Sequence, residues 1–134
     1  LCAAPDYVQQ QGLPQSPDQL MQHTIISASS ISPSVEWKFK QNSEITTIRI
    51  KPRLVVTTND AAIEAASTGF GITRLMSYQI APQLANNTLQ IILSEYELAP
   101  LPVHVIHREG RHKSARVRSF VDLMVEGLRA KLAV

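Results

Sequence analysis

A predicted junction between a strand and a helix carries the side chains best suited to holding a ligand. Thr57, Thr58, Asn59 and Asp60 follow the apolar run Leu54–Val56 and precede an alanine-rich stretch. Small hydroxyls and the free backbone N–H groups of a helix N-terminus can hold a carboxylate or a similar anion. Helix capping alone explains the same residue types equally well. Because an inward-pointing Asp60 would repel an anion, we assign the binding role to the threonines and Asn59.

The histidines and the single cysteine are the other candidates for chemistry. The histidines are His23, His104, His107 and His112. His104 and His107 are three residues apart on a predicted strand, so their imidazoles would point to opposite faces. No carboxylate or cysteine is placed to complete a metal site, and we predict neither a metal nor a cofactor. Cys2 has no base near it in sequence and is predicted to be a buried structural thiol.

Two further stretches could suggest phosphate or nucleic-acid binding, and neither fits. The segment Gly69-Phe70-Gly71 follows a predicted helix, whereas a dinucleotide-binding glycine loop precedes one. The basic residues Arg111, Lys113, Arg116 and Arg118 lie at the start of a predicted helix, where positive charge opposes the macrodipole. We interpret this basic cluster as a solvated face or a contact between subunits.

Composition fits one compact domain. The 134 residues are 44% hydrophobic, 18% charged and 5% aromatic, with a formal net charge of +2. This balance does not suit a domain that follows phosphates along a basic, aromatic-rich face. No stretch reaches the roughly 20 apolar residues of a membrane helix, and the first residues lack the parts of a signal peptide. With one cysteine, we expect a cytoplasmic chain that begins within a strand.

Hydrophobic periodicity predicts alternating strands and helices. The expected strands are residues 1–4, 24–26, 35–39, 45–50, 54–56, 70–76, 89–93 and 103–106. The expected helical segments are 7–11, a turn at 16–20, an alanine-rich helix at 61–66 and an amphipathic helix from Ser114. Strands 35–39 and 45–50 form a hairpin, and residues 27–34 form a loop. Leu89, Ile91 and Leu93 are expected on one side of their strand.

A βαβ unit is predicted in the middle of the chain. Leu54–Val56 is short and β-branched enough for a buried parallel strand. Asn59 or Asp60 caps the helix that follows, and Gly69 is placed for a left-handed C-terminal residue. Residues 70–76 supply the second strand of a right-handed crossover.

Nine short motifs follow one another in a specific order. They are CAAPDY at 2–7, GLP at 12–14, PDQL at 17–20 with His23, WKF at 37–39, TND at 58–60, AASTGFGI at 65–72, LANNTLQIIL at 84–93, LPVHV at 101–105 and RVRSFVD at 116–122. Together they resemble the effector-binding domain of LysR-type transcriptional regulators over nearly the whole chain. The sequence departs from the family at Asn86-Asn87, where a glycine is frequent and asparagine accepts the same left-handed backbone.

The resemblance implies an α/β fold of the periplasmic-binding-protein-like type 2, with a mixed sheet flanked by helices. In that family two subdomains are joined by crossing strands, and a small effector binds between them. Residues 1–4 would be a crossover strand, 5–102 the second regulatory subdomain, and 103–134 the return strand and final helix of the first. The helix-turn-helix, the linker helix and most of the first subdomain would be missing here.

The resemblance also implies a function without catalysis or a membrane. The parent protein would bind a small, anionic organic effector, form a dimer or tetramer, and contact DNA only through the absent N-terminal domain. Carried over by position, the effector-binding residues would be Thr57, Thr58, Asn59, Gly71, Ile72, Ile25 and Ser27. The apolar stripe of the final helix would lack its usual subdomain, so we expect this chain to form an oligomer or a swapped arrangement.

Two other protein classes remain as alternatives. A periplasmic-type solute-binding protein has a similar two-lobed fold, although the PDQL motif with His23 favours the regulator. A helix-turn-helix upstream in the parent gene would decide between them. An enzyme on the same scaffold, such as a deaminase of the porphobilinogen type, would need a cofactor-linked cysteine beside a carboxylate, and Cys2 lacks that setting.

Overall fold

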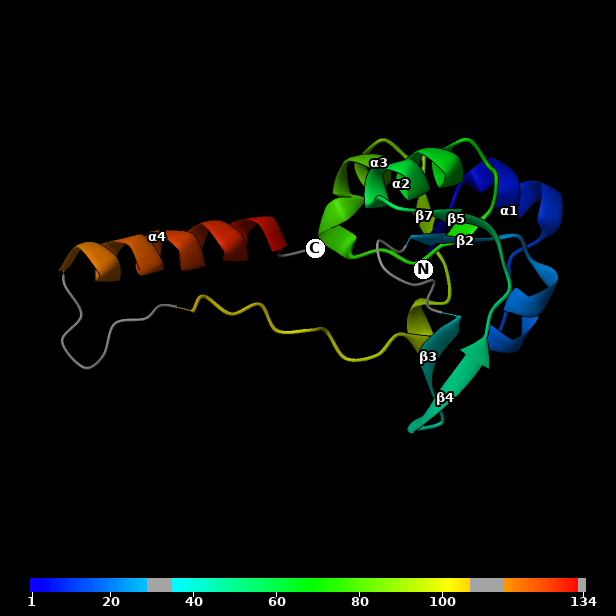
Figure 1. Ribbon diagram of the computed structural model, residues 1–134, viewed down its shortest axis with the longest axis horizontal. Helices are drawn as coiled ribbons and strands as arrows, with labels where there is room; N and C mark the ends of the chain where they lie inside the picture. The colour runs from blue at the N-terminus through cyan, green and yellow to red at the C-terminus, as the bar shows by residue number, and fades with distance from the viewer. Residues whose placement is uncertain (29–34, 107–114, 133–134) are drawn as a thin grey trace. The chain divides into compact units, whose positions relative to one another are not determined.

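The chain folds as two units, Leu1–Leu98 and Ala99–Val134, in a computed structural model (Figure 1). The structure describes residues 1–28, 35–106 and 115–132. The first unit contains a five-stranded sheet, a hairpin and the helices that cover them. In the second unit, helix α4 (Ala115–Leu132) confirms the predicted amphipathic helix.

The main sheet is mixed, with the strand order β5-β2-β6-β1-β7. Its strands are β1 (Cys2–Ala3), β2 (Ile25–Ala28), β5 (Pro52–Val56), β6 (Ile72–Thr73) and β7 (Gln90–Ile91). Strand β2 pairs in parallel with β5 and β6, whereas β1 pairs antiparallel to β6 and β7. The carboxyl ends of β2, β5 and β6 therefore lie along one edge of the sheet.

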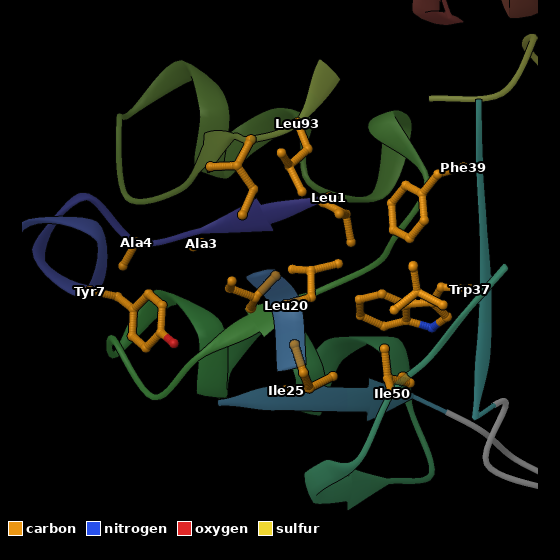
Figure 2. Packing of buried hydrophobic residues seen from close by; sticks show 13 residues of the cluster. Leu1, Ala3, Ala4, Tyr7, Leu20, Ile25, Trp37, Phe39, Ile50 and Leu93 are labelled. Carbon is orange, nitrogen blue, oxygen red and sulfur yellow. The ribbon is translucent and has the colours of Figure 1, made fainter. Parts of the chain in front are cut away.

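Alternation along the short strands produces an apolar core on each face of the sheet. Helices α2 (Asn59–Ser67) and α3 (Ala81–Ala85) lie on one side of the sheet in Figure 1. Cys2 and Ile26 belong to the core that includes Ala62 and Ile63 of α2. The opposite core contains residues of the sheet, of α1 (Pro5–Gln11), of the 3-10 helix η1 (Pro17–Gln22) and of the hairpin (Figure 2).

The predicted hairpin is confirmed. Its strands are β3 (Glu36–Gln41) and β4 (Glu44–Arg49), which pair antiparallel over their whole length. Asn42 and Ser43 form the connecting turn with φ angles of 50° and 70°, as a two-residue hairpin with matching twist requires. The hairpin buries Trp37 and Phe39 against the main sheet, beside Ile25 and Ile50 (Figure 2).

Strand lengths and pairings differ from the prediction in the βαβ unit. Strand β5 is an edge strand rather than a buried one, with the side chain of Val55 48% exposed. The strand predicted at 70–76 consists only of Ile72–Thr73, and it pairs with β2 rather than with β5. The crossover from β5 to β6 therefore passes over one strand, because β2 lies between β5 and β6 in the sheet.

Three boundaries also need correction. The first helix begins at Pro5 rather than Tyr7, because proline is readily accepted at the first helical position. Ser27 and Ala28 belong to β2 instead of a loop, since both continue its pairing with β5. The remaining residues of that predicted loop, 29–34, lie outside the described residues.

The alternation predicted at 89–93 is wrong. Strand β7 is only two residues long, and Ile91 is 46% exposed while Leu89 and Leu93 are buried. Leu93 adopts a left-handed φ of 55°, which ends the extended backbone that alternation requires. Ile92, rather than Ile91, is buried between Leu89 and Leu93 in the sequence.

The predicted strand at 103–106 is not formed. These residues have no regular secondary structure, and the described part of the second unit contains no other strand to pair with them. An unpaired segment cannot satisfy strand hydrogen bonds. Several predictions fall in residues 107–114, which lie outside the described residues. They concern His107, the turn at 109–110, Arg111, His112, Lys113 and the helix cap at Ser114.

The buried side chain of Tyr7 joins helix α1 to the start of β2. The Tyr7 hydroxyl oxygen accepts a hydrogen bond from the backbone N–H of Thr24 at 3.0 Å and lies 3.1 Å from Nδ1 of His23. Tyr7 can donate its proton to Nδ1 only when that nitrogen carries none. Burial lowers the pKa of His23 below its ordinary value. The fold therefore favours the neutral imidazole.

We expect this histidine to make stability dependent on pH. Because the pKa of His23 is lower in the folded chain, the unfolded chain binds the proton first as pH falls through about 6.5. The free energy of unfolding should therefore decrease as pH falls through that range and recover above it. Urea titrations between pH 5 and 8 would measure this slope. His23→Gln should reduce this slope, and equal slopes in the wild type and the variant would contradict the assignment.

Candidate functional site

Three parallel strands end at the same edge of the main sheet and present polar residues there. Ser27 lies near the end of β2, Thr57 follows β5, and Arg74 follows β6. The register pairs Ser27 with Val55 and Ile26 with Thr73, so Ser27 and Arg74 are at the same level of adjacent strands. In open α/β sheets, ligands bind outside the carboxyl ends of parallel strands. This carboxyl edge is therefore the candidate site.

The junction between β5 and α2 supplies exposed polar groups to this edge. Thr57, Thr58 and Asn59 are all exposed. Thr58 is the N-cap of α2, because its Oγ1 accepts a hydrogen bond from the backbone N–H of Ala61 at 3.2 Å. The expectation that Asn59 or Asp60 caps the helix is wrong, since both are already helical residues. Among the described residues, neither Thr57 nor Asn59 makes a side-chain hydrogen bond, so both remain available to a ligand.

We expect Thr58→Ala to lower the free energy of unfolding by about 1 kcal/mol, because the N–H of Ala61 loses its capping partner. Thr57→Ala is the matched control, since it removes a neighbouring exposed hydroxyl that caps nothing, and a change within about 0.5 kcal/mol is expected. Chemical denaturation of the two variants would measure the difference. Equal losses would show that the cap is not a source of stability.

The other residues predicted for the site lie deeper. Ile25 and Ile72 face each other across β2 and β6 in the core, at 1% and 0% exposure. Gly71 precedes β6 and is buried against the backbone of Thr24. Ser27 is also buried, at 4% exposure, but stands next to the carboxyl edge. The structure thus brings Ser27 toward the same edge as Thr57, while the two isoleucines and Gly71 form the packing beneath.

Arg74 is a residue that the sequence analysis did not single out. It is partly buried, and its guanidinium carbon lies 5.5 Å from the ring centroid of Phe39 on β3. Burial lowers the pKa of Arg74, and the carboxylate of Glu97 acts in the opposite direction. No local sequence signal marked Arg74, because residue 74 lies inside the strand predicted at 70–76, whereas β6 ends at Thr73.

The cysteine is placed as a structural residue. Cys2 has 0% exposure, and its Sγ lies 3.8 Å from the carbonyl oxygen of Thr73, which can accept a weak hydrogen bond from it. Burial raises the pKa of the Cys2 thiol to about 11. A thiol with that pKa is protonated near neutral pH and is a poor nucleophile.

The described residues show no cluster of three or more histidine, cysteine, aspartate or glutamate side chains able to hold a metal ion. Within the same ranges, no helix combines the length and the apolar character needed to span a membrane.

Comparison with protein families identifies the chain. Residues 1–129 match the family model described as the LysR substrate binding domain. The chain belongs to this family. As a LysR substrate-binding domain it has the type 2 periplasmic-binding-protein-like fold, which confirms the predicted fold class.

Curated relatives of this LysR domain are transcriptional regulators. An uncharacterized HTH-type transcriptional regulator of Haemophilus influenzae is 27% identical over 115 residues, which are 86% of this chain and 40% of the relative. An HTH-type transcriptional repressor of Pseudomonas aeruginosa is 30% identical over 129 residues, or 94% of this chain and 40% of the relative. The chain thus spans about 40% of the length of these relatives.

Solved structures support the same fold. The regulatory domain of AphB from Vibrio vulnificus superimposes with a TM-score of 0.78 at 22% identity, covering 94% of this chain and 62% of that one. The regulatory domain of CrgA from Neisseria meningitidis, a LysR-type transcriptional regulator, gives a TM-score of 0.70 at 20% identity, covering 95% and 62%.

Proposed function

We propose that this LysR domain is the effector-sensing part of a cytoplasmic, non-enzymatic transcriptional regulator. The observation that carries the proposal is the carboxyl edge, where polar residues from three parallel strands converge in a chain of this family. Thr57, Asn59 and the N-terminus of α2 suit a small organic anion, because exposed hydroxyl, amide and backbone N–H groups can donate to it. Ile25, Ile72 and Gly71 support that surface from below.

The proposal extends to the parts of the regulator outside this chain. Residues 1–4 would be a crossover strand, 5–102 the second regulatory subdomain, and 103–134 would complete the first. Effector bound between the subdomains would favour one relative orientation and so alter how paired DNA-binding domains sit on an operator. The alternative of a solute-binding protein is less well supported, because the curated relatives described above are named as transcriptional regulators.

Ligand binding to the intact regulator tests this function. Thermal unfolding would be followed with a panel of small organic acids and, in parallel, with neutral compounds of similar size. At least one compound should raise Tm in a concentration-dependent way, because a ligand that binds only the folded state stabilises it. The same compound should change operator affinity. If no compound in either panel shifts Tm or operator binding, the sensing function is wrong.

The apolar face of α4 gives an independent test on the present chain. Phe120, Leu123 and Met124 are 59%, 67% and 38% exposed. We propose that this helix packs against the missing part of the first subdomain in the parent and that the isolated chain associates through it. Light scattering should find a dimer or larger assembly, and Phe120→Glu should shift it toward monomer. Arg129→Glu, at an exposed position of the same helix, is the charge-changing control. A monomeric wild-type chain would overturn this assignment of α4.

A further inference from the structure

Arg74 stands at the end of β6 on the carboxyl edge. The register places it beside Ser27, and alternation directs both side chains to the face that already holds Ile25 and Ile72. The cation–π contact with Phe39 confirms that the guanidinium lies on the hairpin side of the sheet. Phe39 is 1% exposed, so this contact is made with a fixed ring rather than a mobile surface side chain.

Phe39 holds the guanidinium of Arg74 in place, but the N–H donors of the guanidinium lack hydrogen-bond acceptors among the described residues. The cation–π contact places the guanidinium carbon over the Phe39 ring and gives none of the five N–H donors an oxygen acceptor. Among the described residues, no hydrogen bond or ion pair to these donors is found. Partial burial of an unpaired cation is costly, and a bidentate anion would offset that cost.

The nearby acidic group does not fill this role. Glu97 attracts Arg74 electrostatically, but among the described residues no ion pair joins the two groups, and the Glu97 side chain is 50% exposed. The polar neighbours on the other side are neutral, since Ser27 lies on the adjacent strand and Thr57 follows the strand beyond it. On the side of Ser27 and Thr57, an incoming anion would therefore meet the Arg74 cation and hydroxyl groups.

We propose that Arg74 anchors a carboxylate group of the effector through a forked, two-hydrogen-bond contact. This inference rests on the proposed sensing function and adds to it a specificity-determining residue. The planar guanidinium matches the geometry of a carboxylate, whereas lysine would offer only a point charge. The ring of Phe39 keeps the fork oriented toward the carboxyl edge, which reduces the side-chain entropy lost on binding.

Titration of the isotope-labelled chain with defined carboxylates tests the anchor. The probes are benzoate, succinate and citrate, with benzamide as the neutral analogue and sodium chloride at matched ionic strength. The Nε–Hε resonance of Arg74 should shift saturably with at least one carboxylate and remain unmoved by benzamide or chloride. Failure of all three carboxylates, or an equal response to benzamide or chloride, would overturn the proposal.

Variants separate a binding role from a structural one. Backbone amides near Ser27 would report affinity when Arg74 is replaced. Arg74→Gln should weaken carboxylate binding at least tenfold, and Arg74→Lys should fall between it and wild type. Arg53→Gln is the matched control, because Arg53 is an exposed arginine on β5. This variant should bind carboxylates as tightly as the wild type does. Far-UV spectra and Tm would verify that each variant folds.

The two proposals fail in different ways. If carboxylates bind wild type and Arg74→Gln equally, or if the intact regulator responds only to neutral compounds, the anchor is wrong while sensing stands. If carboxylates move Arg74 as expected but no compound alters Tm or operator binding of the intact regulator, the sensing function is wrong and Arg74 is only a carboxylate-binding residue.

Discussion

Gly71→Ala is expected to lower the free energy of unfolding by about 3 kcal/mol. A Cβ atom at residue 71 would lie 2.4 Å from the carbonyl oxygen of Thr24, and 3.0 Å from both its carbonyl carbon and its Cγ2. That oxygen cannot move freely, because it accepts a hydrogen bond from the N–H of Ile72 at 2.9 Å. Relief of the clash would therefore separate β2 from β6 at the first residue of their pairing, at a cost typical of a forced overpacking.

A second glycine provides the control for this prediction. Gly127 lies in helix α4, and a Cβ there would meet nothing within 4 Å. Gly127→Ala should leave the first unit unchanged and stabilise α4 by up to about 1 kcal/mol, because alanine has the higher helix propensity. Denaturation curves followed by near-ultraviolet absorption of Trp37 report on the first unit. If Gly71→Ala unfolds at the wild-type midpoint, the close approach of the two strands is wrong.

Local patterns predicted the elements that are stabilised by their own residues. The hairpin at 36–49 follows from alternation and a turn built on Asn42 and Ser43, and α4 follows from its three-and-four spacing. The lengths of β6 and β7 were overestimated because a strand extends only as far as its partner does. Their partner β1 has two residues, so neither can be longer on that side. This information is not present in the segments themselves.

The candidate site was predictable where it depends on a local motif. The strand-to-helix junction at Thr57 and Thr58 was recognised from the change in period, although the cap was predicted at Asn59 or Asp60, one or two positions after Thr58. Arg74 could not be found in this way. Its importance comes from the register of β6 on β2 and from Phe39, which is 35 residues earlier in the chain. Sequence spacing does not reveal such a contact.

Phe39→Ala is expected to lower the free energy of unfolding by about 3 to 5 kcal/mol. Phe39 is 1% exposed, and its removal would leave a cavity between the hairpin and the main sheet beside Trp37 and Leu1 (Figure 2). Fixed neighbours on both sides limit how far this space can collapse. Chemical denaturation followed by circular dichroism would measure the loss.

Two further variants show what the ring itself contributes. Ile45→Ala, on the exposed face of the same hairpin, should change the free energy of unfolding by less than about 0.5 kcal/mol, because Ile45 is already 66% exposed. Phe39→Leu keeps most of the buried apolar volume but removes the aromatic face beneath Arg74. It should therefore recover much of the stability lost in Phe39→Ala while still weakening the carboxylate response of Arg74. Full recovery of that response in Phe39→Leu would mean that the ring fills space and does not orient the guanidinium.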